Sequence, residues 1–384
     1  MTPLSSQSLI NSFAERFQRS TDQAIVVRAP GRLNLLGEHT DYNGGFVLPI
    51  AIDRATWIVA ALADHQVRIW SEAKGEQDIF DPAAIAHAGT SPWTSYVRGV
   101  LWALGEQGIA IGGADLLIAG DLPLSAGVSS SASLETAAAL AFLALAGREM
   151  APRDVALLCQ HAEHEFAGVN CGIMDQFAVG LSQANHALLL DCRSLETRAV
   201  PLAGDAPVFF VCDTGKPRTL AASAYNQRRA ECEGAAHHFG VESLRDVTLP
   251  MIDSDREQLG ETVYRRCRHV ISENERVLQA PEAMARGDWD TFGILLQQSH
   301  ASLRDDYEVS CDELDIMCEL AQQHPGCLGA RMVGAGFGGC AMAAVERGAV
   351  EGFGEVLANK YRTATSREPR IFAVQAAAGA SIVV

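Results

Sequence analysis

A stretch rich in glycine and serine, DLPLSAGVSSSASLE at residues 121–135, constrains the fold of this chain more than any other feature. An apolar run typical of a strand precedes it, and an alanine-rich pattern typical of a helix follows at residues 132–146. The start of a helix leaves about four backbone N–H groups unpaired and carries a partial positive charge, so it can bind an anion. Four serines between residues 129 and 133 are more than helix capping requires. The pattern therefore predicts a phosphate-binding turn from Pro123 to Ser133.

Other nucleotide-binding motifs do not compete with this interpretation. No G-x-x-x-x-G-K-[ST] sequence is formed at Gly215 and Lys216, because Pro217 follows them. The run GAGFGG at residues 334–339 matches G-x-G-x-x-G, but it leads into CAMAAV, which is typical of a strand, whereas a dinucleotide-binding fold requires a helix there. We predict a glycine-rich hairpin or loop, which either approaches a ligand closely or is an ordinary tight β connection.

The chain is too long for one hydrophobic core, because cores stop growing at roughly 250 residues and this chain has 384. The first half mixes expected strands, at residues 24–28, 46–52 and 55–62 among others, with expected helices at 132–146 and 153–166. The second half ends on a strand, loop, strand, helix and strand, an order that suits a split β-α-β sandwich. We predict an α+β protein of two domains, residues 1–203 and 204–384.

The charge and the termini exclude several classes of partner. A formal net charge of −17 opposes attraction to nucleic acid or to an anionic membrane surface. The longest uncharged alanine and leucine run, residues 136–147, is shorter than the roughly 20 residues that a membrane-spanning helix needs. The N-terminal residues lack the basic and apolar regions of a signal peptide, and the ten cysteines form no C-x-x-C pair. We expect reduced cysteines, a cytoplasmic location, and neither nucleic acid nor membrane as partner.

A second cluster of polar residues lies near the N-terminus, in APGRLNLLGEHTDYNGG at residues 29–45. Glu38, His39 and Asp41 offer acceptors and a donor at close spacing on an expected turn between strands, which suits the binding of several sugar hydroxyls. Arg32 carries a permanent, forked positive charge that can stabilise a phosphoryl group. A solvated acidic turn with an idle His39 is the alternative that these residues alone leave open.

Three motifs together resemble a known family. GRLNLLGEHTDYNGG is similar to the sugar-recognition signature of galactokinases. PLSAGVSSSAS is similar to the phosphate loop of the small-molecule kinases for galactose, homoserine, mevalonate and phosphomevalonate, and RMVGAGFGGCAM is similar to the third motif of that family. The motifs lie in the family's order and span most of the chain. The resemblance implies the two-domain kinase fold, in which an N-terminal domain like ribosomal protein S5 and a C-terminal ferredoxin-like α+β sandwich enclose the active site between them.

The resemblance also implies an activity, namely ATP- and Mg²⁺-dependent phosphorylation of the C1 hydroxyl of α-D-galactose, which gives galactose 1-phosphate and ADP in the first committed step of galactose metabolism. The segment CGIMDQF at residues 171–177 matches the family's catalytic segment and makes Asp175 the catalytic carboxylate, with Arg32 beside it. Whether Asp175 removes a proton or only orients the hydroxyl stays open, and alone it would be interpreted as a helix cap. The implied magnesium ligands are Ser131 and Glu163.

The implied binding residues form two further sets. Those for the sugar are Glu38, His39, Thr40, Asp41, Gly172 and Tyr225. Those for ATP are Ser125, Ala126, Gly127, Val128, Ser129, Ser130, Ser131 and, near the adenine, Trp93. For Trp93, core packing beside Tyr96 and Val97 is the alternative. Ser125 and Ala335 stand where the family more commonly has glycine, and we expect them to alter nucleotide affinity at most.

Competing hypotheses remain for the metal and for the substrate. His161, Glu163 and His164 together suggest a zinc site, but their spacing is not H-E-x-x-H, and oxygen ligands favour magnesium. The alternatives to a galactokinase are a kinase for N-acetylgalactosamine or arabinose, and a non-catalytic protein that senses galactose and ATP. We expect a monomer whose ligands are small molecules.

Overall fold

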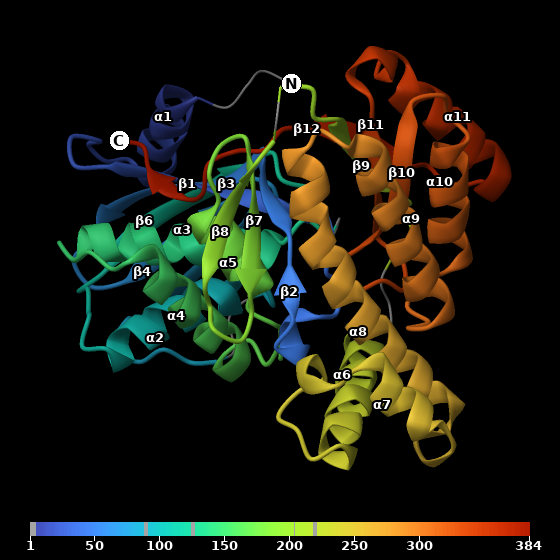
Figure 1. Ribbon diagram of the computed structural model, residues 1–384. Helices are drawn as coiled ribbons and strands as arrows, with labels where there is room; N and C mark the ends of the chain where they lie inside the picture. Colours follow the sequence, from blue (N-terminus) through green and yellow to red (C-terminus); the bar gives the residue numbers. More distant parts are fainter. Residues whose placement is uncertain (1–4, 88–90, 124–126, 203, 218–220) are drawn as a thin grey trace.

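The computed structural model describes residues 5–87, 91–123, 127–202, 204–217 and 221–384, which form two lobes (Figure 1). The first lobe is built on a six-stranded sheet with the order β13-β1-β3-β6-β4-β5. Neighbouring strands are antiparallel, except that β4 and β6 are parallel. The strands are β1 (Ile25–Asn34), β3 (Pro49–Leu62), β4 (Val67–Ser71), β5 (Glu76–Phe80), β6 (Ala114–Gly120) and β13 (Ser381–Ile382).

Helices cover both faces of this sheet because successive residues of a strand point to opposite sides. Val27 packs with residues of α2 (Thr94–Glu106), α3 (Ser130–Leu145) and α4 (Pro152–Glu165), whereas Val26 packs against α1 (Ser6–Phe17). Five alanines of α3 are fully buried, and their small side chains let this helix lie close to β1 and β3. The phosphate-loop helix is therefore held in the centre of the lobe.

A small three-stranded sheet lies beside this lobe, with the order β2-β7-β8. Its strands are β2 (Phe46–Val47), β7 (His186–Asp191) and β8 (Thr197–Pro201). One apolar cluster joins it to α4 and to the short helix α5 (Met174–Leu181) through Val47, Ala156, Phe177 and Leu190. The segments on either side of β2 and α5 thus lie close together, and both carry predicted site residues.

The second lobe has a four-stranded antiparallel sheet with the order β10-β11-β9-β12. Its strands are β9 (Val208–Asp213), β10 (Cys327–Val333), β11 (Cys340–Val345) and β12 (Arg370–Val374). Its helices are α6 (Ala221–His238), α7 (Leu249–Ser254), α8 (Arg256–Ala285), α9 (Trp289–Asp305), α10 (Asp312–Gln322) and α11 (Phe353–Thr365). Short 3₁₀ turns complete the chain at Asp41–Asn43, Leu244–Asp246 and Arg347–Ala349.

The two lobes share an apolar core. Leu33 and Ile50 of the first lobe pack in one cluster with Val277 and Met284 of α8 and with Met342 of β11. In Figure 1 the long helix α8 runs beside the first lobe, while α6 and α7 project below it. Continuous apolar contact of this kind fixes how the segments that line the space between the lobes are placed.

The last residues of the chain return to the first lobe. Val27 and Arg28 of β1 pair with Ile382 and Ser381 of β13, and the Ala377 N–H donates to the Ala51 carbonyl at 2.9 Å. The division into residues 1–203 and 204–384 stays a prediction, and Ala203 lies outside the described residues. The pairing of β13 means that a cut at this position leaves an edge strand of the first sheet in the second segment.

The predicted α+β class and the strand, loop, strand, helix, strand ending are confirmed, the latter as β10, β11, α11 and β12. The prediction that the first strand ends near residue 28 is wrong, because β1 continues to Asn34 through Pro30 and Gly31. A register shift between Pro30 and Arg32 accommodates this pair, which usually breaks strands. The separate strands predicted at 46–52 and 55–62 are also wrong in their division, since β3 is continuous from Pro49 to Leu62.

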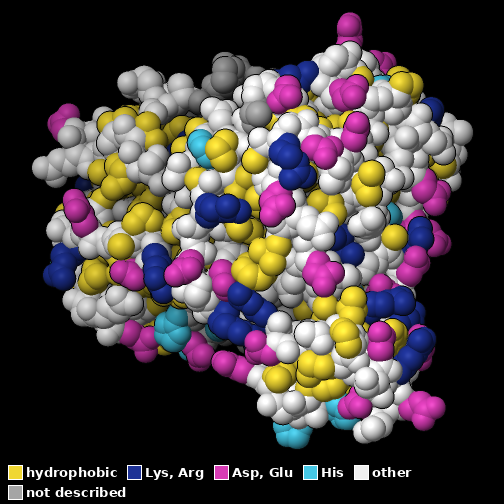
Figure 2. Space-filling view, in the orientation of Figure 1, with side chains coloured by type: hydrophobic (Ala, Val, Ile, Leu, Met, Phe, Trp, Pro, Cys, Tyr) yellow, Lys and Arg dark blue, Asp and Glu magenta, His cyan; other side chains and the backbone are white. Residues whose placement is uncertain are grey.

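Two features concern the prediction that neither nucleic acid nor a membrane is a partner, namely the surface charge and the character of the helices. On the face seen in Figure 2, Lys and Arg side chains are interspersed with Asp and Glu side chains. Within the described part of the chain, no helix combines the length and the apolar character that crossing a membrane requires.

Candidate active site

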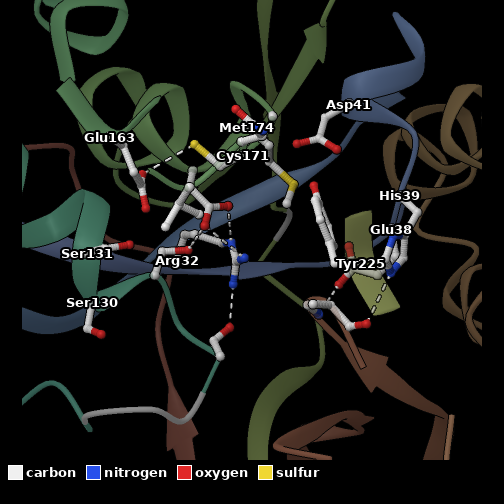
Figure 3. A pocket seen from close by; sticks show the side chains of 18 of the residues that line it. Arg32, Glu38, His39, Asp41, Ser130, Ser131, Glu163, Cys171, Met174 and Tyr225 are labelled. Atoms are coloured by element: carbon white, nitrogen blue, oxygen red, sulfur yellow. Dashed lines mark hydrogen bonds and ion pairs between the residues drawn. The ribbon is translucent and has the colours of Figure 1, made fainter. Parts of the chain in front are cut away.

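A cavity of about 360 Å³ brings together most of the predicted site residues. Its lining comes from β1, the turn after β1, the start of α3, α4, the segment before α5, α6 and the loop between β10 and β11. Figure 3 shows Arg32 in the middle, with Ser130, Ser131 and Glu163 on one side and Glu38, His39 and Tyr225 on the other. The residues predicted to bind phosphate and those predicted to bind the sugar thus line one cavity.

The phosphate loop ends at Ser129, the residue that precedes the first turn of α3. Gly127 and Ser129 have positive φ angles of 71° and 58°, and Ser129 makes no capping hydrogen bond. The Ser130 and Ser131 side chains line the cavity beside the start of the helix. This geometry leaves the first N–H groups of α3 to face an anion.

Three other predicted ATP-binding residues are placed differently. Ser125 and Ala126 lie outside the described residues. Val128 is buried in the shared core and does not line the cavity, but its carbonyl accepts a hydrogen bond from the Arg32 backbone N–H at 3.1 Å. Its side chain therefore has a packing role, and only its backbone supports the site.

Asp175 lies in the first turn of α5 and meets Arg32 through a forked ion pair. Arg32 Nε donates to Asp175 Oδ1 at 2.9 Å, and Nη2 donates to Oδ2 at 3.2 Å. Ser129 Oγ donates to Oδ2 at 2.5 Å, and Arg32 Nη1 donates to the Gly127 carbonyl at 2.5 Å. The Arg32 side chain is 5% exposed and the Asp175 side chain 26%. The Asp175 carboxylate therefore faces the cavity, while the buried guanidinium of Arg32 binds it from the protein side.

Glu163 lies next to Ser131 at one end of the cavity (Figure 3). Its Oε2 accepts from Gln176 Nε2 at 2.7 Å and from the Cys171 thiol at 3.3 Å. Burial raises the pKa of Glu163 to about 7, with a further contribution from Asp175, although hydrogen bonds from Cys171 and Ser131 act against the shift. Burial and the nearby Glu163 carboxyl raise the pKa of Glu135 well above its ordinary value.

The zinc interpretation is not supported. His161 Nε2 contacts Glu106 Oε2 at 2.9 Å, and the His161 ring stacks on Trp102. His164 Nε2 donates to the Cys171 carbonyl at 2.8 Å. Among the described residues, no group of three or more His, Cys, Asp and Glu side chains is arranged to hold a metal ion.

The opposite end of the cavity is formed by the turn after β1. Glu38, His39 and Asp41 line it, together with Gly172 and Tyr225. A β-carbon at Gly172 would lie 1.7 Å from Asp41 Oδ2, so glycine leaves the room that the Asp41 carboxyl occupies. Burial, together with Asp175 and Glu38, raises the pKa of Asp41 to about 7. A carboxyl close to two others, inside a small cavity, is suited to hydrogen bonds with ligand hydroxyls.

Thr40, which was predicted to bind the sugar, does not line the cavity. Its hydroxyl lies 2.9 Å from the Gly37 carbonyl and 2.7 Å from the Phe46 carbonyl, and the side chain is fully buried. The Thr40 hydroxyl therefore stabilises the backbone of the turn instead of facing a ligand. Its neighbours in sequence point into the cavity, but Thr40 points into the protein.

Glu38 connects the turn to the glycine-rich loop of the second lobe. The Gly334 N–H donates to Glu38 Oε1 at 2.7 Å, and the buried Arg331 guanidinium lies 3.3 Å from the same oxygen. Arg331 also donates to the carbonyls of Asn34 at 2.6 Å and Leu35 at 2.7 Å. The run at residues 334–339 is a loop between β10 and β11, as predicted, and Gly334 and Ala335 line the cavity.

Helix α8 supports the backbone of the same turn. Glu273 Oε1 accepts from the Gly37 N–H at 2.9 Å, and Asn274 Oδ1 accepts from the Phe46 N–H at 2.9 Å. His269 Nε2 donates to the Glu38 carbonyl at 3.1 Å. Nearby Arg276 and His269 outweigh the burial of Glu273 and lower its pKa to about 2, so this carboxylate stays charged. The turn that carries the polar cluster is thus held by the second lobe.

A second cavity of about 330 Å³ lies beside the first and shares Ser130 and Ser131 with it. Trp93 lines this second cavity together with Tyr96 and Lys74. The Trp93 indole N–H donates to Glu76 Oε2 at 2.8 Å, which fixes the ring. Trp93 therefore borders a ligand-sized space on the far side of the phosphate loop, in addition to packing against the core.

Three family models match parts of this chain. The galactokinase galactose-binding signature matches residues 11–62, and the N- and C-terminal domains of GHMP kinases match residues 95–183 and 281–363. The galactokinase of Roseiflexus sp. (strain RS-1) is 47% identical over 378 residues, which are 96% of this chain and 96% of the relative. The galactokinase of Chloroflexus aurantiacus is 44% identical, with 93% of each chain covered.

This chain belongs to the galactokinase family.

Solved structures agree with this family membership. The galactokinase of Lactococcus lactis, crystallised with galactose, has a TM-score of 0.93 at 37% identity, with 98% of this chain and 99% of that chain covered. The mevalonate kinase of Methanococcus jannaschii has a TM-score of 0.65 at 16% identity, with 93% and 99% covered, and shares the fold. The predicted kinase fold of two α+β domains is confirmed.

Sequence reasoning missed several residues that support this galactokinase-family site. They are Glu135, His269, Glu273, Asn274, Tyr307 and Arg331. Two of them carried a signal, because Glu135 is a single acid in an otherwise uncharged helix and Arg331 is a charge inside an apolar strand. Both are buried, and Arg331 meets specific partners there, namely the Asn34 and Leu35 carbonyls and Glu38. The residues of α8 and Tyr307 lie in polar sequence and carried no such signal.

Proposed function

We propose that this chain is a galactokinase, which transfers the γ-phosphoryl group of ATP to the C1 hydroxyl of α-D-galactose and releases galactose 1-phosphate and ADP. One observation carries the proposal: the Arg32 and Asp175 pair lies in a single cavity between a phosphate-binding helix start and a turn rich in sugar-binding groups. A phosphoryl donor and a hydroxyl acceptor bound at these two ends meet at that pair. Family membership supports the same activity.

The phosphates of ATP lie at the start of α3 in this proposal. The free N–H groups of Ser130 and Ser131 bind phosphate oxygens, and the helix dipole adds a favourable field. The adenine occupies the second cavity against Trp93, since both cavities meet at these serines. Catalysis then depends mainly on positioning and on charge stabilisation around the γ-phosphate.

Magnesium fits the residues at this end of the cavity. Glu163 and Glu135 are buried carboxyls whose pKa values are raised, a state that a bound cation would reverse. Glu163 and Ser131 offer the oxygen ligands that magnesium prefers, and both face the phosphate site. A Mg²⁺ ion held by Glu163 and Ser131 would offset negative charge on the phosphates of ATP.

Asp175 accepts the proton of the C1 hydroxyl as that oxygen attacks the γ-phosphorus. The new bond joins the C1 oxygen to phosphorus, the bond from phosphorus to the bridging oxygen breaks, and ADP leaves with its electron pair. Arg32 holds the Asp175 carboxylate in place through two hydrogen bonds and offers its positive charge to the phosphoryl oxygens on which charge develops. The proton held by Asp175 returns to solvent when the products leave.

Glu38, His39, Asp41 and Tyr225 hold the sugar at the other end. The carboxylates accept hydrogen bonds from sugar hydroxyls, and the Tyr225 ring provides an apolar surface. Gly172 leaves room for Asp41 and brings its own backbone to the cavity. This arrangement restricts the acceptor to a polyhydroxylated molecule of monosaccharide size.

A coupled assay across a sugar panel tests the proposal. Purified protein with ATP and Mg²⁺ is given galactose, N-acetylgalactosamine, arabinose and glucose in parallel, and the release of ADP is measured. We expect turnover with galactose to exceed that with the other sugars. Faster turnover with N-acetylgalactosamine or arabinose would assign a different substrate, and binding of galactose and ATP without ADP release would indicate a sensor.

We propose a cytoplasmic monomer that binds galactose and ATP as its partners. All ten cysteines are free, which supports a reducing compartment. Size-exclusion chromatography with light scattering measures the mass of the particle, and a dimer mass would overturn the monomer.

A further inference from the structure

We infer that Tyr307, which follows α9, is a positioning residue for sugar recognition, because it orients a chain of hydrogen bonds that fixes His39 as an N–H donor at the cavity. The inference deepens the proposed function and rests on it for the identity of the sugar. Tyr307 is fully buried and 265 positions from Tyr42, the residue that it contacts. It does not line the cavity itself.

Four side chains form the chain of hydrogen bonds. His39 Nε2 lies 3.3 Å from the Ala335 carbonyl, and His39 Nδ1 lies 2.8 Å from the Tyr42 hydroxyl. The Tyr42 hydroxyl lies 2.8 Å from the Tyr307 hydroxyl, which lies 3.1 Å from the Cys232 sulfur. These hydrogen bonds thus lead from the glycine-rich loop, past the end of the cavity that His39 lines, to the buried Cys232 of α6.

The direction of every bond follows from the carbonyl at one end. A carbonyl oxygen can only accept, so the proton of His39 is on Nε2. The Nδ1 atom of a neutral imidazole then accepts, so the Tyr42 hydroxyl donates to it. Because a hydroxyl has one hydrogen, Tyr307 must donate to Tyr42, and the Cys232 thiol must donate to Tyr307.

If both ring nitrogens of His39 were protonated, the directions of the hydrogen bonds would no longer be fixed. The surroundings of His39 oppose this second protonation. His39 is 4% exposed, and burial, with the nearby His269, lowers its pKa to about 3. The backbone of His39 also has a positive φ of 63°, which places its side chain differently from those of its neighbours. The ring is therefore neutral, and its orientation depends on the partners on either side.

Tyr307 is held firmly enough to act in this way. Arg228 Nε donates to the Tyr307 carbonyl at 2.7 Å, and Arg266 Nη1 donates to the neighbouring Asp306 carbonyl at 2.6 Å. The Val309 carbonyl accepts from the Phe337 N–H of the glycine-rich loop at 2.7 Å. The turn at residues 306–309 thus links two buried arginines to the loop that carries Ala335.

The consequence for the sugar is specific. His39 lines the cavity, and its only ring donor is Nε2–H, which already makes a long 3.3 Å contact with the Ala335 carbonyl. A sugar hydroxyl that meets this N–H shares its hydrogen with that carbonyl and must accept. Glu38 and Asp41 accept when they are ionised, so His39 supplies a group of opposite character at the same end of the cavity. Without Tyr307, the Tyr42 oxygen receives no hydrogen bond and can accept from Nδ1–H instead, so only the long Ala335 contact still favours the proton on Nε2.

Two measurements on the full chain test the inference. The first is the ¹⁵N spectrum of histidine-labelled protein, with His39 assigned from a His39→Gln variant. The second is the KM for galactose and for ATP in the Tyr307→Phe variant. The matched control is Tyr264→Phe, because Tyr264 donates to Asp253 at 2.7 Å and lies outside the cavity.

We expect the Nε2–H form of His39 in the unchanged protein and a mixture of both forms in Tyr307→Phe. The KM for galactose should rise roughly three- to tenfold, the range of one neutral hydrogen bond, while the KM for ATP and the Tyr264→Phe control stay unchanged. An Nδ1–H form in the unchanged protein overturns the inference even if the variant does not fold. So does an unchanged galactose KM in a folded Tyr307→Phe variant.

A failure of the proposed function gives a different pattern. If galactose is not the substrate, no turnover with galactose is seen in any variant, while the ¹⁵N spectra still report the form of His39. Loss of the Nε2–H preference in Tyr307→Phe would then keep the positioning role and leave only the identity of the sugar wrong.

Discussion

Arg32 and Asp175, 143 positions apart in the sequence, meet through two parallel hydrogen bonds of 2.9 and 3.2 Å. The pair joins β1, which leads into the turn that carries Glu38 and His39, with α5, which follows Gly172. In the proposed reaction, a carboxylate held by a guanidinium between the two ends of the cavity is placed to receive a proton.

Asp175→Asn should therefore lower kcat by about 10² to 10⁴, the usual contribution of a positioned proton acceptor. The amide keeps the size of the side chain, so the galactose KM should change little. Initial rates with saturating ATP and Mg²⁺ measure both constants. A kcat within a few-fold of the unchanged protein would mean that Asp175 only orients the hydroxyl.

Arg32→Lys should lower kcat more than tenfold, or about 1.4 kcal/mol in barrier, although the positive charge is kept. An ammonium group cannot reproduce the fork that bonds Asp175 and the Gly127 carbonyl together. The control is Arg54→Lys, at an arginine whose ion pair with Asp121 is about one third exposed. Equal rates for both variants would contradict a specific role for the guanidinium.

Glu163→Gln should raise the Mg²⁺ concentration needed for half-maximal activity by at least about tenfold, as loss of a charged ligand does. Glu165→Gln, an exposed neighbour in the same helix, is the matched control. Removing divalent metal with EDTA should stop turnover in all three proteins. Identical Mg²⁺ titrations for the two variants would exclude Glu163 as a ligand.

Asp41→Asn should change how stability depends on pH. The pKa of Asp41 is raised from 3.8 to about 7, so the folded chain binds this proton more tightly than the unfolded chain. Its contribution is present in full below about pH 4 and is lost as the pH rises through about 7. The unfolding free energy of the unchanged protein, minus that of the variant, should fall over this range by at most a few kcal/mol, since one pKa unit is about 1.4 kcal/mol.

Thermal unfolding of the ligand-free proteins at several pH values measures this difference. The shift of His39 in the opposite direction affects both proteins equally and cancels. Asp154→Asn, at an exposed position of α4, should run parallel to the unchanged protein. A constant difference between Asp41→Asn and the unchanged protein would mean that the Asp41 carboxyl has an ordinary pKa.

Gly172→Ala should raise the galactose KM at least about tenfold, because the added carbon overlaps the Asp41 carboxylate and forces it to move. The KM for ATP should stay close to its original value. Gly105→Ala, where an added carbon meets nothing within 4 Å, is the control. Unchanged galactose kinetics in Gly172→Ala would show that Asp41 does not contact the sugar.

Much of this site could be predicted from the sequence because its chemistry is carried by local motifs. Glu38, His39 and Asp41 lie within four residues of each other, and the serines of the phosphate loop are consecutive. Their proximity in space follows from their proximity in the chain. Asp175 and Glu163 required the resemblance to a family, since neither stands out by local pattern.

The supporting residues could not be predicted, for a physical reason. Glu273, Tyr307 and Arg331 act across the two lobes, and their partners lie more than 200 positions away. Such contacts depend on tertiary packing, which composition and periodicity do not describe. Thr40 shows the converse, because it sits inside a recognisable motif but its hydroxyl bonds to the backbone. A motif predicts the place of a site better than the direction of each side chain.

The return of the chain end to β1 has a mechanical consequence. The backbone crosses between the lobes twice, once after β8 and once between β12 and β13. Bodies joined by a single tether can pivot in any direction, whereas two separated tethers leave only a rocking movement about the line through both. A twist of one lobe against the other would therefore have to break the pairing of β13 with β1 at the edge of the first sheet.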